Sequence, residues 1–292
     1  SLRIDFDILD SKTLLGESGF YLYKTNEIVF LDLLNPSVFF YSITNKTLSK
    51  EKLNLPKPLG NIYPMHNGQF IISNLDGLHV YDRNKKTIKY YQDIRGTDEL
   101  HKISYNDGTI TKNKLWIGLS HIKETKNLGY FGYLQNNKFN KLDQGFKVSN
   151  GPAVDEKQNK LYFSNSLNSS IYQYNLKTLK KKLIYKLKKN QGFPDGIALD
   201  NKNGLWVAHW AGGQISRINL KTKEIDVAIK VPALNVTSVT FVGKKLNHIF
   251  VTSAKIETSK TKMQTYKYSG SSFIIKTNFT GQKITYSNLN QQ

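Results

Sequence analysis

The amino-acid sequence predicts an all-β fold, a six-bladed β-propeller, and three observations support this prediction. First, six short apolar segments recur along the chain, and the spacings between their second residues are 42, 45, 46, 44 and 44. Second, a period of about 40–50 residues with several strands per unit is typical of propeller blades. Third, the segments are rich in β-branched and aromatic residues, and the turns between them are rich in Asn, Gly, Asp and Lys. The segments cover residues 27–30, 69–72, 114–117, 160–163, 204–207 and 248–251.

Each of these segments is interpreted as the first strand of its repeat unit. A second strand follows, usually about ten residues later, and a polar turn leads from it into a third strand. Examples are strand 78–81 before turn 82–85, strand 171–174 before turn 175–178, and strand 215–218 before turn 219–222. We expect no helix beyond one short turn over residues 98–103, and we expect residues 1–292 to form one domain. A stacked β-solenoid is the structural alternative, although its repeats are usually shorter.

The composition excludes several classes of protein. Hydrophobic residues make up 39% and aromatic residues 12% of the 292 residues, which is too apolar for a disordered chain. No segment approaches the ~18 uncharged apolar residues of a membrane helix, so no membrane partner is expected. The absence of cysteine excludes disulfides, thiolate metal sites and a cysteine nucleophile. The chain carries no signal-peptide pattern, so we expect a cytoplasmic protein. Because the sequence begins at Ser1 rather than Met, we also expect a trimmed N-terminus, which leaves the periplasm open.

The net charge of +20 raises the question of nucleic-acid binding. Only four of the 42 basic residues are Arg, the residue that reads bases and forks phosphates. The Lys residues are spread over the chain, mostly in polar turns. We therefore expect a solvated basic surface and no nucleic-acid partner. A polyanion-binding scaffold remains a third, weaker hypothesis for function.

Polar residues that precede the apolar segments are the candidate site residues, because the inner parts of propeller blades converge on one axis. The sequence contains no HExxH, GxSxG, P-loop, GxGxxG or EF-hand motif. Asn150 and Asp195 lie about ten residues before the fourth and fifth segments, and Asn106 lies nine residues before the third. Glu17 opens the first unit. An Asn or Asp followed soon by Gly is also common in plain turns, so a structural role stays open for each.

These residues lie in segments that resemble the family of gluconolactonase, regucalcin (senescence marker protein) and luciferin-regenerating enzyme. Residues 193–200 read FPDGIALD, residues 204–208 read GLWVA and residues 251–254 read VTSA. The SNG of residues 149–151 and the LGE of residues 15–17 match further segments of the family pattern. The resemblance covers nearly the whole chain. It implies a six-bladed propeller with a metal-binding central channel that hydrolyses sugar lactones to aldonic acids.

The resemblance also implies roles for particular residues. Glu17, Asn150 and Asp195 would be the protein ligands of one divalent metal ion, Asp195 would also be the general base, and Asn106 would contact the substrate. Three oxygen ligands, two of them carboxylates, favour a hard cation. Ca²⁺ is the leading choice, and Mg²⁺, Mn²⁺ and Zn²⁺ are alternatives. Because three protein ligands leave coordination positions open, the metal can activate water and polarise a lactone carbonyl.

The sequence departs from the family pattern at residues that would contact the substrate. Ser104 replaces the Arg that would grip substrate hydroxyls, so we expect a roomier and less polar pocket. Glu124 is the nearest candidate for the acidic substrate contact that follows the third segment. His209 follows the fifth segment and is a further candidate for substrate contact, with a structural role as the alternative.

The leading hypothesis is therefore a metal-dependent lactonase that takes a small sugar lactone as its substrate. The alternative is a propeller that binds a divalent metal or another ligand without turnover, which the Arg replaced by Ser104 makes possible. The protein is expected to be a monomer or a weak homodimer.

Overall fold

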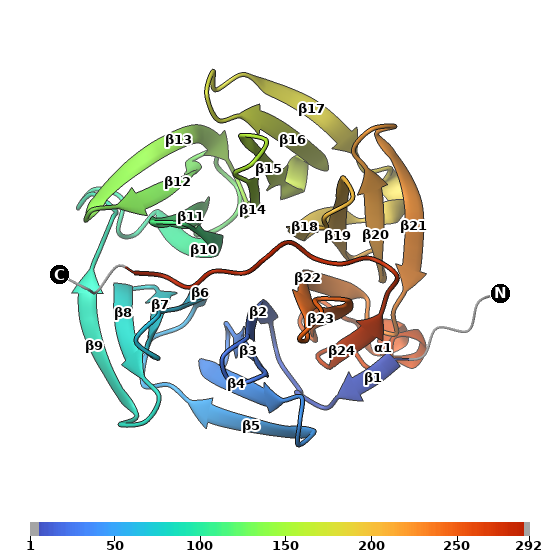
Figure 1. The fold of residues 1–292 in the computed structure, drawn as a ribbon, viewed down its shortest axis with the longest axis horizontal. Coiled ribbons are helices and arrows are strands. Elements are labelled where there is room, and N and C mark those ends of the chain that lie inside the picture. The colour runs from blue at the N-terminus through green and yellow to red at the C-terminus, as the bar shows by residue number, and fades with distance from the viewer. Residues whose placement is uncertain (1–5, 289–292) are drawn as a thin grey trace.

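The computed structural model describes residues 6–288 and shows six four-stranded antiparallel sheets arranged in a ring (Figure 1). This arrangement confirms the predicted six-bladed β-propeller. The six innermost strands surround the axis and are β2 (Gly16–Leu22), β6 (Leu59–Pro64), β10 (Ile103–Thr111), β14 (Ser149–Asp155), β18 (Phe193–Leu199) and β22 (Asn235–Val242).

The other three strands of each blade follow outward from the axis. The second strands are β3 (Glu27–Asp32), β7 (Phe70–Asn74), β11 (Lys114–His121), β15 (Lys160–Asn165), β19 (Gly204–Trp210) and β23 (His248–Ala254). The third strands are β4 (Ser37–Ser42), β8 (Gly77–Asp82), β12 (Gly129–Gln135), β16 (Ser170–Asn175), β20 (Gln214–Asn219) and β24 (Ser272–Lys276). The outer strands are β5 (Thr47–Lys52), β9 (Thr87–Gln92), β13 (Lys138–Phe146), β17 (Lys181–Lys186), β21 (Glu224–Lys230) and β1 (Phe6–Leu9).

The position of the six apolar segments within the blades differs from the prediction. Each segment lies in the second strand of its blade, so a blade has four strands rather than three. Five of the innermost strands escape the sequence pattern because Gly or Pro interrupts them, as at Gly151 and Pro152 in β14 and at Pro194 and Gly196 in β18. The remaining strand, β22, contains neither. Gly and Pro are typical of turns, so a strand that contains them is difficult to predict from its sequence.

The second strands form the most buried part of each blade because neighbouring blades pack against both of their faces. Ile28, Leu115, Leu161, Leu205 and Ile249 are all 0% exposed. This double burial explains why these strands are nearly continuous apolar runs, and why their period is the clearest signal in the sequence.

The sixth blade is completed by the N-terminal end of the chain. Its outer strand β1 pairs antiparallel with β24, with Phe6 opposite Ile275 and Leu9 opposite Ser272. The ring is thereby closed by hydrogen bonds between the two ends of the sequence, and the sheet gains a strand that the order of the repeats does not reveal.

Helical structure is scarce. The expectation of no helix is wrong at one place, since α1 (Lys260–Thr265) forms after Ser259, whose side chain accepts a hydrogen bond from the Lys262 amide at 3.1 Å. Two short 3₁₀ turns, η1 (Ser166–Asn168) and η2 (Lys189–Gln191), complete the helical elements of residues 6–288. The expected turn over residues 98–103 is present, with the Lys102 amide donating to the Glu99 carbonyl at 2.9 Å. Within the described residues, no helix is long and apolar enough to cross a membrane.

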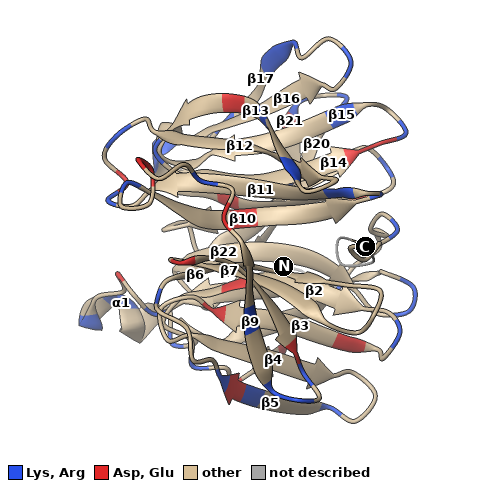
Figure 2. Ribbon diagram, turned by 90° about the vertical axis from the view of Figure 1, so that its left-hand side faces the viewer, with Lys and Arg blue, Asp and Glu red and all other residues tan. Residues whose placement is uncertain are grey.

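The basic residues lie mainly on turns and on the outer parts of the blades (Figure 2). Lys50 on β5, Lys89 on β9 and Lys182 on β17 are exposed on outer strands, whose edges are otherwise free to pair with another sheet. Lysine on an edge strand discourages such pairing. This distribution fits the expected solvated surface.

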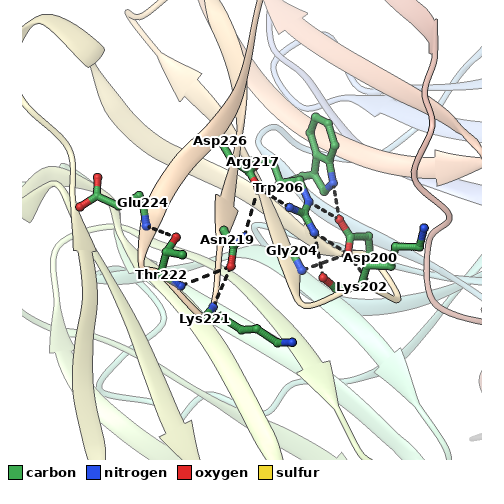
Figure 3. Close-up of polar contacts among 10 residues, drawn as sticks. All are labelled: Asp200, Lys202, Gly204, Trp206, Arg217, Asn219, Lys221, Thr222, Glu224 and Asp226. Carbon is green, nitrogen blue, oxygen red and sulfur yellow. Dashed lines mark hydrogen bonds and ion pairs between the residues drawn. The ribbon is translucent and has the colours of Figure 1, made fainter.

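A buried ion pair ties the fifth blade together (Figure 3). Arg217 Nε donates to Asp200 Oδ2 at 2.7 Å, and the two side chains are 4% and 0% exposed. Trp206 Nε1 donates to the same oxygen at 2.9 Å. Burial by itself would raise the pKa of Asp200, but the hydrogen bonds, led by that from Arg217, lower it. Asp200, Trp206 and Arg217, which are part of the family pattern, therefore stabilise the packing of this blade.

Removal of Asp200 tests this role. We expect Asp200→Ala to lower the free energy of unfolding by about 3–5 kcal/mol, because it leaves a buried guanidinium with one partner fewer. Asp226→Ala is the matched control, since Asp226 also binds Arg217, at 2.6 Å, but is 36% exposed. It should cost less than about 1 kcal/mol. Urea denaturation of both variants measures the difference, and equal costs would contradict the assignment.

Candidate active site

The innermost strands place six equivalent residues around the channel axis. In every blade, the second residue of the apolar segment pairs with a residue of the innermost strand, as Ile28 does with Tyr21 and Leu205 does with Leu199. The residue four positions before each such partner is equivalent in all blades. These six residues, here called the channel ring, are Glu17, Gly60, Asn106, Asn150, Asp195 and Thr237.

Contacts between neighbouring blades agree with this register. Asn106 Nδ2 donates to Asn150 Oδ1 at 3.3 Å, and Thr237 Oγ1 donates to the carbonyl of Gly16, beside Glu17. The structure therefore brings together the four sequence-predicted residues Glu17, Asn106, Asn150 and Asp195, although they are spread over 179 positions (195 − 17 + 1) of the chain. The other two ring members, Gly60 and Thr237, add no charge.

An interruption of strand pairing accompanies the ring in each blade. The pairing of the innermost strand shifts between Glu17 and Phe20 in β2 and between Pro194 and Ile197 in β18, and equivalent shifts occur in the other four blades. Such bulges bend a strand and redirect its side chains, and they are frequent beside active sites. A glycine lies within or directly beside the bulge in five of these strands, whereas the bulge of β22 lies at Thr237.

Two buried carboxyl groups of the ring lie next to each other. Glu17 and Asp195 are 6% and 7% exposed, and their carboxyl groups are close enough to share a hydrogen bond. Burial raises the pKa of Glu17 well above its ordinary value, and the charges of Asp195 and Asp107 raise it further. Burial also raises the pKa of Asp195, and the charge of Asp107 is the second-largest cause of this rise. Oδ1 of Asp195 is buried without a hydrogen-bond partner.

Asp107 is a third acidic residue of this site, and the sequence analysis did not assign it a role. Its two oxygens accept hydrogen bonds from the amides of Gly108, at 2.9 Å, and Gly151, at 2.8 Å. Burial raises its pKa to about 6, against the opposing effect of these two hydrogen bonds. Its place directly after Asn106 was the available signal, but the sequence does not show which residues of a bulge face the axis.

The two ring asparagines are held by side-chain hydrogen bonds. Asn150 Nδ2 donates to Ser166 Oγ at 2.8 Å, which leaves the carbonyl end of that amide toward Asn106. Asn106 Nδ2 donates to the Ser149 carbonyl at 2.6 Å. The amide of Asn150 is thus oriented with its nitrogen toward Ser166 and its oxygen toward Asn106, its neighbour in the ring.

Two other predicted substrate residues lie toward the end of the channel at which the ring sits. Ser104 is half-buried on β10, opposite Ser120 and two residues before Asn106. Glu124 lies on the exposed loop after β11, and its charge contributes to the raised pKa of Asp195. Partial enclosure of its own carboxyl raises the pKa of Glu124, and nearby Glu257 adds to this effect. Both residues lie outside the channel ring.

His209 is held inside the fifth blade. It is 0% exposed, and its ring nitrogens are 2.8 Å from the Gln191 carbonyl and 2.6 Å from Ser216 Oγ. Burial lowers its pKa. With both nitrogens engaged, His209 has a structural environment, and the geometry does not bring it to Asp195.

The donor atoms of the ring fit a hard divalent cation. Among residues 6–288, no group of three or more His, Cys, Asp or Glu side chains is placed to hold a metal ion. The candidate ligand set contains only two carboxylates, Glu17 and Asp195, and completes them with the amide oxygen of Asn150. The unpaired buried Oδ1 of Asp195 requires a proton or a cation, and oxygen donors of this kind suit Ca²⁺, Mg²⁺ or Mn²⁺.

A cavity of about 180 Å³ continues the channel beyond the ring. Its walls come from the innermost strands and include Asp107 and Gly196.

A six-bladed propeller that carries buried carboxyl groups at its axis belongs to the class of propellers with a polar site in the central channel. Residues 15–255 match the model of the SMP-30/gluconolactonase/LRE-like region, and the chain belongs to this family.

Known proteins of this kind resemble the chain over most of its length. Regucalcin of Danio rerio is 24% identical over 258 residues, which are 85% of this chain and 86% of that protein. The structure of regucalcin from Agrobacterium tumefaciens, described as a calcium-binding protein, superimposes with a TM-score of 0.88 at 18% identity and covers 97% of both chains. A gluconolactonase of Xanthomonas campestris gives a TM-score of 0.74 at 13% identity, over 94% of this chain and 89% of that one. Family membership supports a lactonase-type hydrolase as the class of protein.

The acidic site predicts an unusual pH dependence of stability in protein freed of divalent cations by a chelator. The folded state keeps protons on Asp107, with its pKa of about 6, and on Glu17 and Asp195, whereas the unfolded chain has released them above about pH 4. This stabilising effect is complete below the unfolded pKa values and is lost as the pH rises through the folded ones. The free energy of unfolding should therefore fall between about pH 5 and about pH 7.

Urea unfolding at several pH values in that interval measures the slope. Asp107→Asn should make the slope shallower. Asp82→Asn should leave it unchanged, because the pKa of Asp82 is lowered, mainly by the hydrogen bond that it accepts from the Lys85 amide, so Asp82 does not titrate in this interval in either state. A slope that is the same in all three proteins would contradict the assignment.

Proposed function

We propose that this protein is a metal-dependent lactonase that opens a sugar lactone to the aldonic acid. The observation that carries the proposal is the buried, unpaired Oδ1 of Asp195 beside Glu17 at the axis of a propeller of this family. Such an atom suits both cation binding and proton transfer. Because the ring draws a residue from each of the six blades, the whole propeller is the proposed catalytic unit, active as a monomer or a weak homodimer.

Glu17, Asn150 and Asp195 are the proposed ligands of one divalent cation, with Ca²⁺ first and Mg²⁺, Mn²⁺ and Zn²⁺ as alternatives. A bound cation would supply Lewis-acid chemistry, polarising the lactone carbonyl and lowering the pKa of a water molecule. Support comes from the donor set and from the related Agrobacterium protein, which is described as calcium-binding.

Asp195 is the proposed general base. Its Oδ1 is buried without a hydrogen-bond partner, so this oxygen is available to accept a proton. As the water oxygen bonds to the carbonyl carbon, Asp195 accepts the water proton. When the ring C–O bond breaks, that proton passes to the departing alkoxide. Asn106 contacts a polar group of the substrate from the neighbouring blade.

Ser104 and Glu124 are proposed to shape substrate preference. With Ser in place of the family Arg, the pocket lacks a fixed positive charge and a bidentate donor. We therefore propose a lactone with fewer polar substituents than a fully hydroxylated sugar lactone. Glu124 would accept a hydrogen bond from a substrate hydroxyl at the open end of the channel.

The second candidate function is metal or ligand binding without turnover. The specific observation in its favour is again Ser104, because the loss of a substrate-gripping Arg can abolish productive binding while leaving the ring unchanged. The two candidates differ in whether a lactone is consumed.

Proton release from a panel of sugar lactones, with and without chelator, separates them. We expect turnover that disappears on chelation and returns when a divalent cation is added. Glu17→Gln should lower both metal content, by elemental analysis, and turnover, because it removes one charged ligand. Metal binding without turnover on any lactone would support the second candidate, and chelator-resistant turnover would contradict the metal-dependent mechanism.

Two substitutions at Asp195 separate its proposed roles. Asp195→Ala should lower both metal affinity and turnover, since it removes the ligand and the base. Asp195→Asn keeps a coordinating oxygen but accepts no proton at neutral pH, so at saturating metal its kcat should fall by roughly 10²–10⁴-fold. The measurement is kcat as a function of metal concentration. Near wild-type kcat in Asp195→Asn at full occupancy would mean that Asp195 is only a ligand.

A further inference from the structure

The last part of the described chain crosses one face of the propeller. After β24, residues 277–288, here called the C-terminal strap, run across the ring of blades from the sixth blade toward the second (Figure 1). The strap lies beyond residues 15–255, which match the family model. Its contacts give it a role that the family match does not assign.

One end of the strap is fixed to the fifth and sixth blades. The Asn201 amide donates to the Thr280 carbonyl at 2.9 Å, and the Gly281 amide donates to the Leu246 carbonyl at 2.8 Å. A Cβ atom at Gly281 would collide with the side chain of Phe241 on β22, so only glycine permits the strap to lie this close to the innermost strand.

The other end is fixed to the first and second blades. The Ser287 amide donates to the Pro64 carbonyl at 2.7 Å, and the His66 amide donates to the Ser287 carbonyl at 3.0 Å. Tyr286 is 5% exposed and stacks on Tyr23 with ring centroids 4.4 Å apart. The strap is therefore anchored on opposite sides of the axis.

Between these anchors the strap lines the channel cavity. Residues 282–285 form part of the wall of the same cavity that contains Asp107 and Gly196. The strap contacts Pro64 at the end of β6 and Asn201 just after the end of β18. The ring members Glu17 and Asp195 instead lie near the beginning of their strands. The ring and the strap thus lie toward opposite ends of the channel.

We propose that the C-terminal strap is the floor of the channel, which makes the site a blind pocket entered only from the end at which the channel ring lies. The floor limits how far a ligand can pass beyond the ring, and it closes a second route for water to Asp107 and Asp195. This role holds whichever reaction the site performs.

The absence of cysteine from the chain allows a direct test by thiol labelling. Ala198→Cys places a reporter on the wall of the cavity. Ala208→Cys, on the neighbouring strand β19 and 0% exposed within the core, is the matched control for unfolding. Each reporter is combined with Gly281→Val, which forces the strap away from Phe241, and separately with a chain that ends at Phe279. Reaction with a bulky maleimide is followed over time.

Ala198 is half-buried with the strap in place. We expect Ala198→Cys to react at least about tenfold faster when the strap is displaced or removed, because loss of part of the cavity wall opens access for a bulky reagent. Ala208→Cys should keep its slow rate in the same backgrounds, which shows that the blades stay folded. Equal rates for Ala198→Cys with and without the strap would overturn the proposal. An equal acceleration of both reporters would overturn it as well, because the strap would then hold the fold together rather than close the channel. Neither measurement depends on lactonase activity.

Discussion

The pairing of β1 with β24 is the interaction on which the rest of the structure depends, because it closes the ring. The site exists only in the closed ring. Glu17 belongs to the first blade and Asp195 to the fifth, and the sixth blade lies between them, with Thr237 bonded to the carbonyl of Gly16. Without β1 in the sixth blade, the first and sixth blades would lose the link that this strand provides and would rely on contacts such as the Leu15–Ala254 bridge and the hydrogen bond from Thr240 Oγ1 to the Gly19 carbonyl. The four residue pairs between β1 and β24 thus help to hold together two carboxyl groups that are distant in the sequence.

Closure of the ring has an electrostatic consequence. It gathers Glu17, Asp107 and Asp195 in one enclosed space, where burial raises the pKa of each group and the charge of Asp107 further raises the pKa values of Glu17 and Asp195. Like charges at close range cannot all remain ionised without a compensating cation or proton. The fold therefore holds the site in a state of higher free energy than the separated residues would have. Packing of the second strands, which are almost completely buried, offsets this cost and keeps the carboxyl groups in place.

The sequence predicts the part of the fold that rests on continuous burial, and it misses the part that rests on local backbone geometry. The six apolar segments were found because both of their faces are covered. Five of the six innermost strands were missed because Gly and Pro at or near their bulges are typical of turns. Asn150 and Asp195 could still be predicted, since their spacing from the apolar segments repeats. Asp107 could not be assigned a role, because only the folded bulge decides which side chain reaches the axis. The environment of His209 depends on Gln191 and Ser216, and no sequence pattern links these residues.

The FPDGIALD…GLWVA stretch, residues 193–208, shows how closely structural and candidate functional residues are mixed in this blade. Asp195 lies in the bulge, buried with an unpaired oxygen. Five residues later, Asp200 is equally buried but is fully bonded to Arg217 and Trp206, and its pKa is lowered rather than raised. Two aspartates of one strand region thus differ in the partners that the fold gives them. An aspartate with a complete set of donors stabilises the blade. An aspartate with an unpaired oxygen is available for a cation, a proton or a substrate.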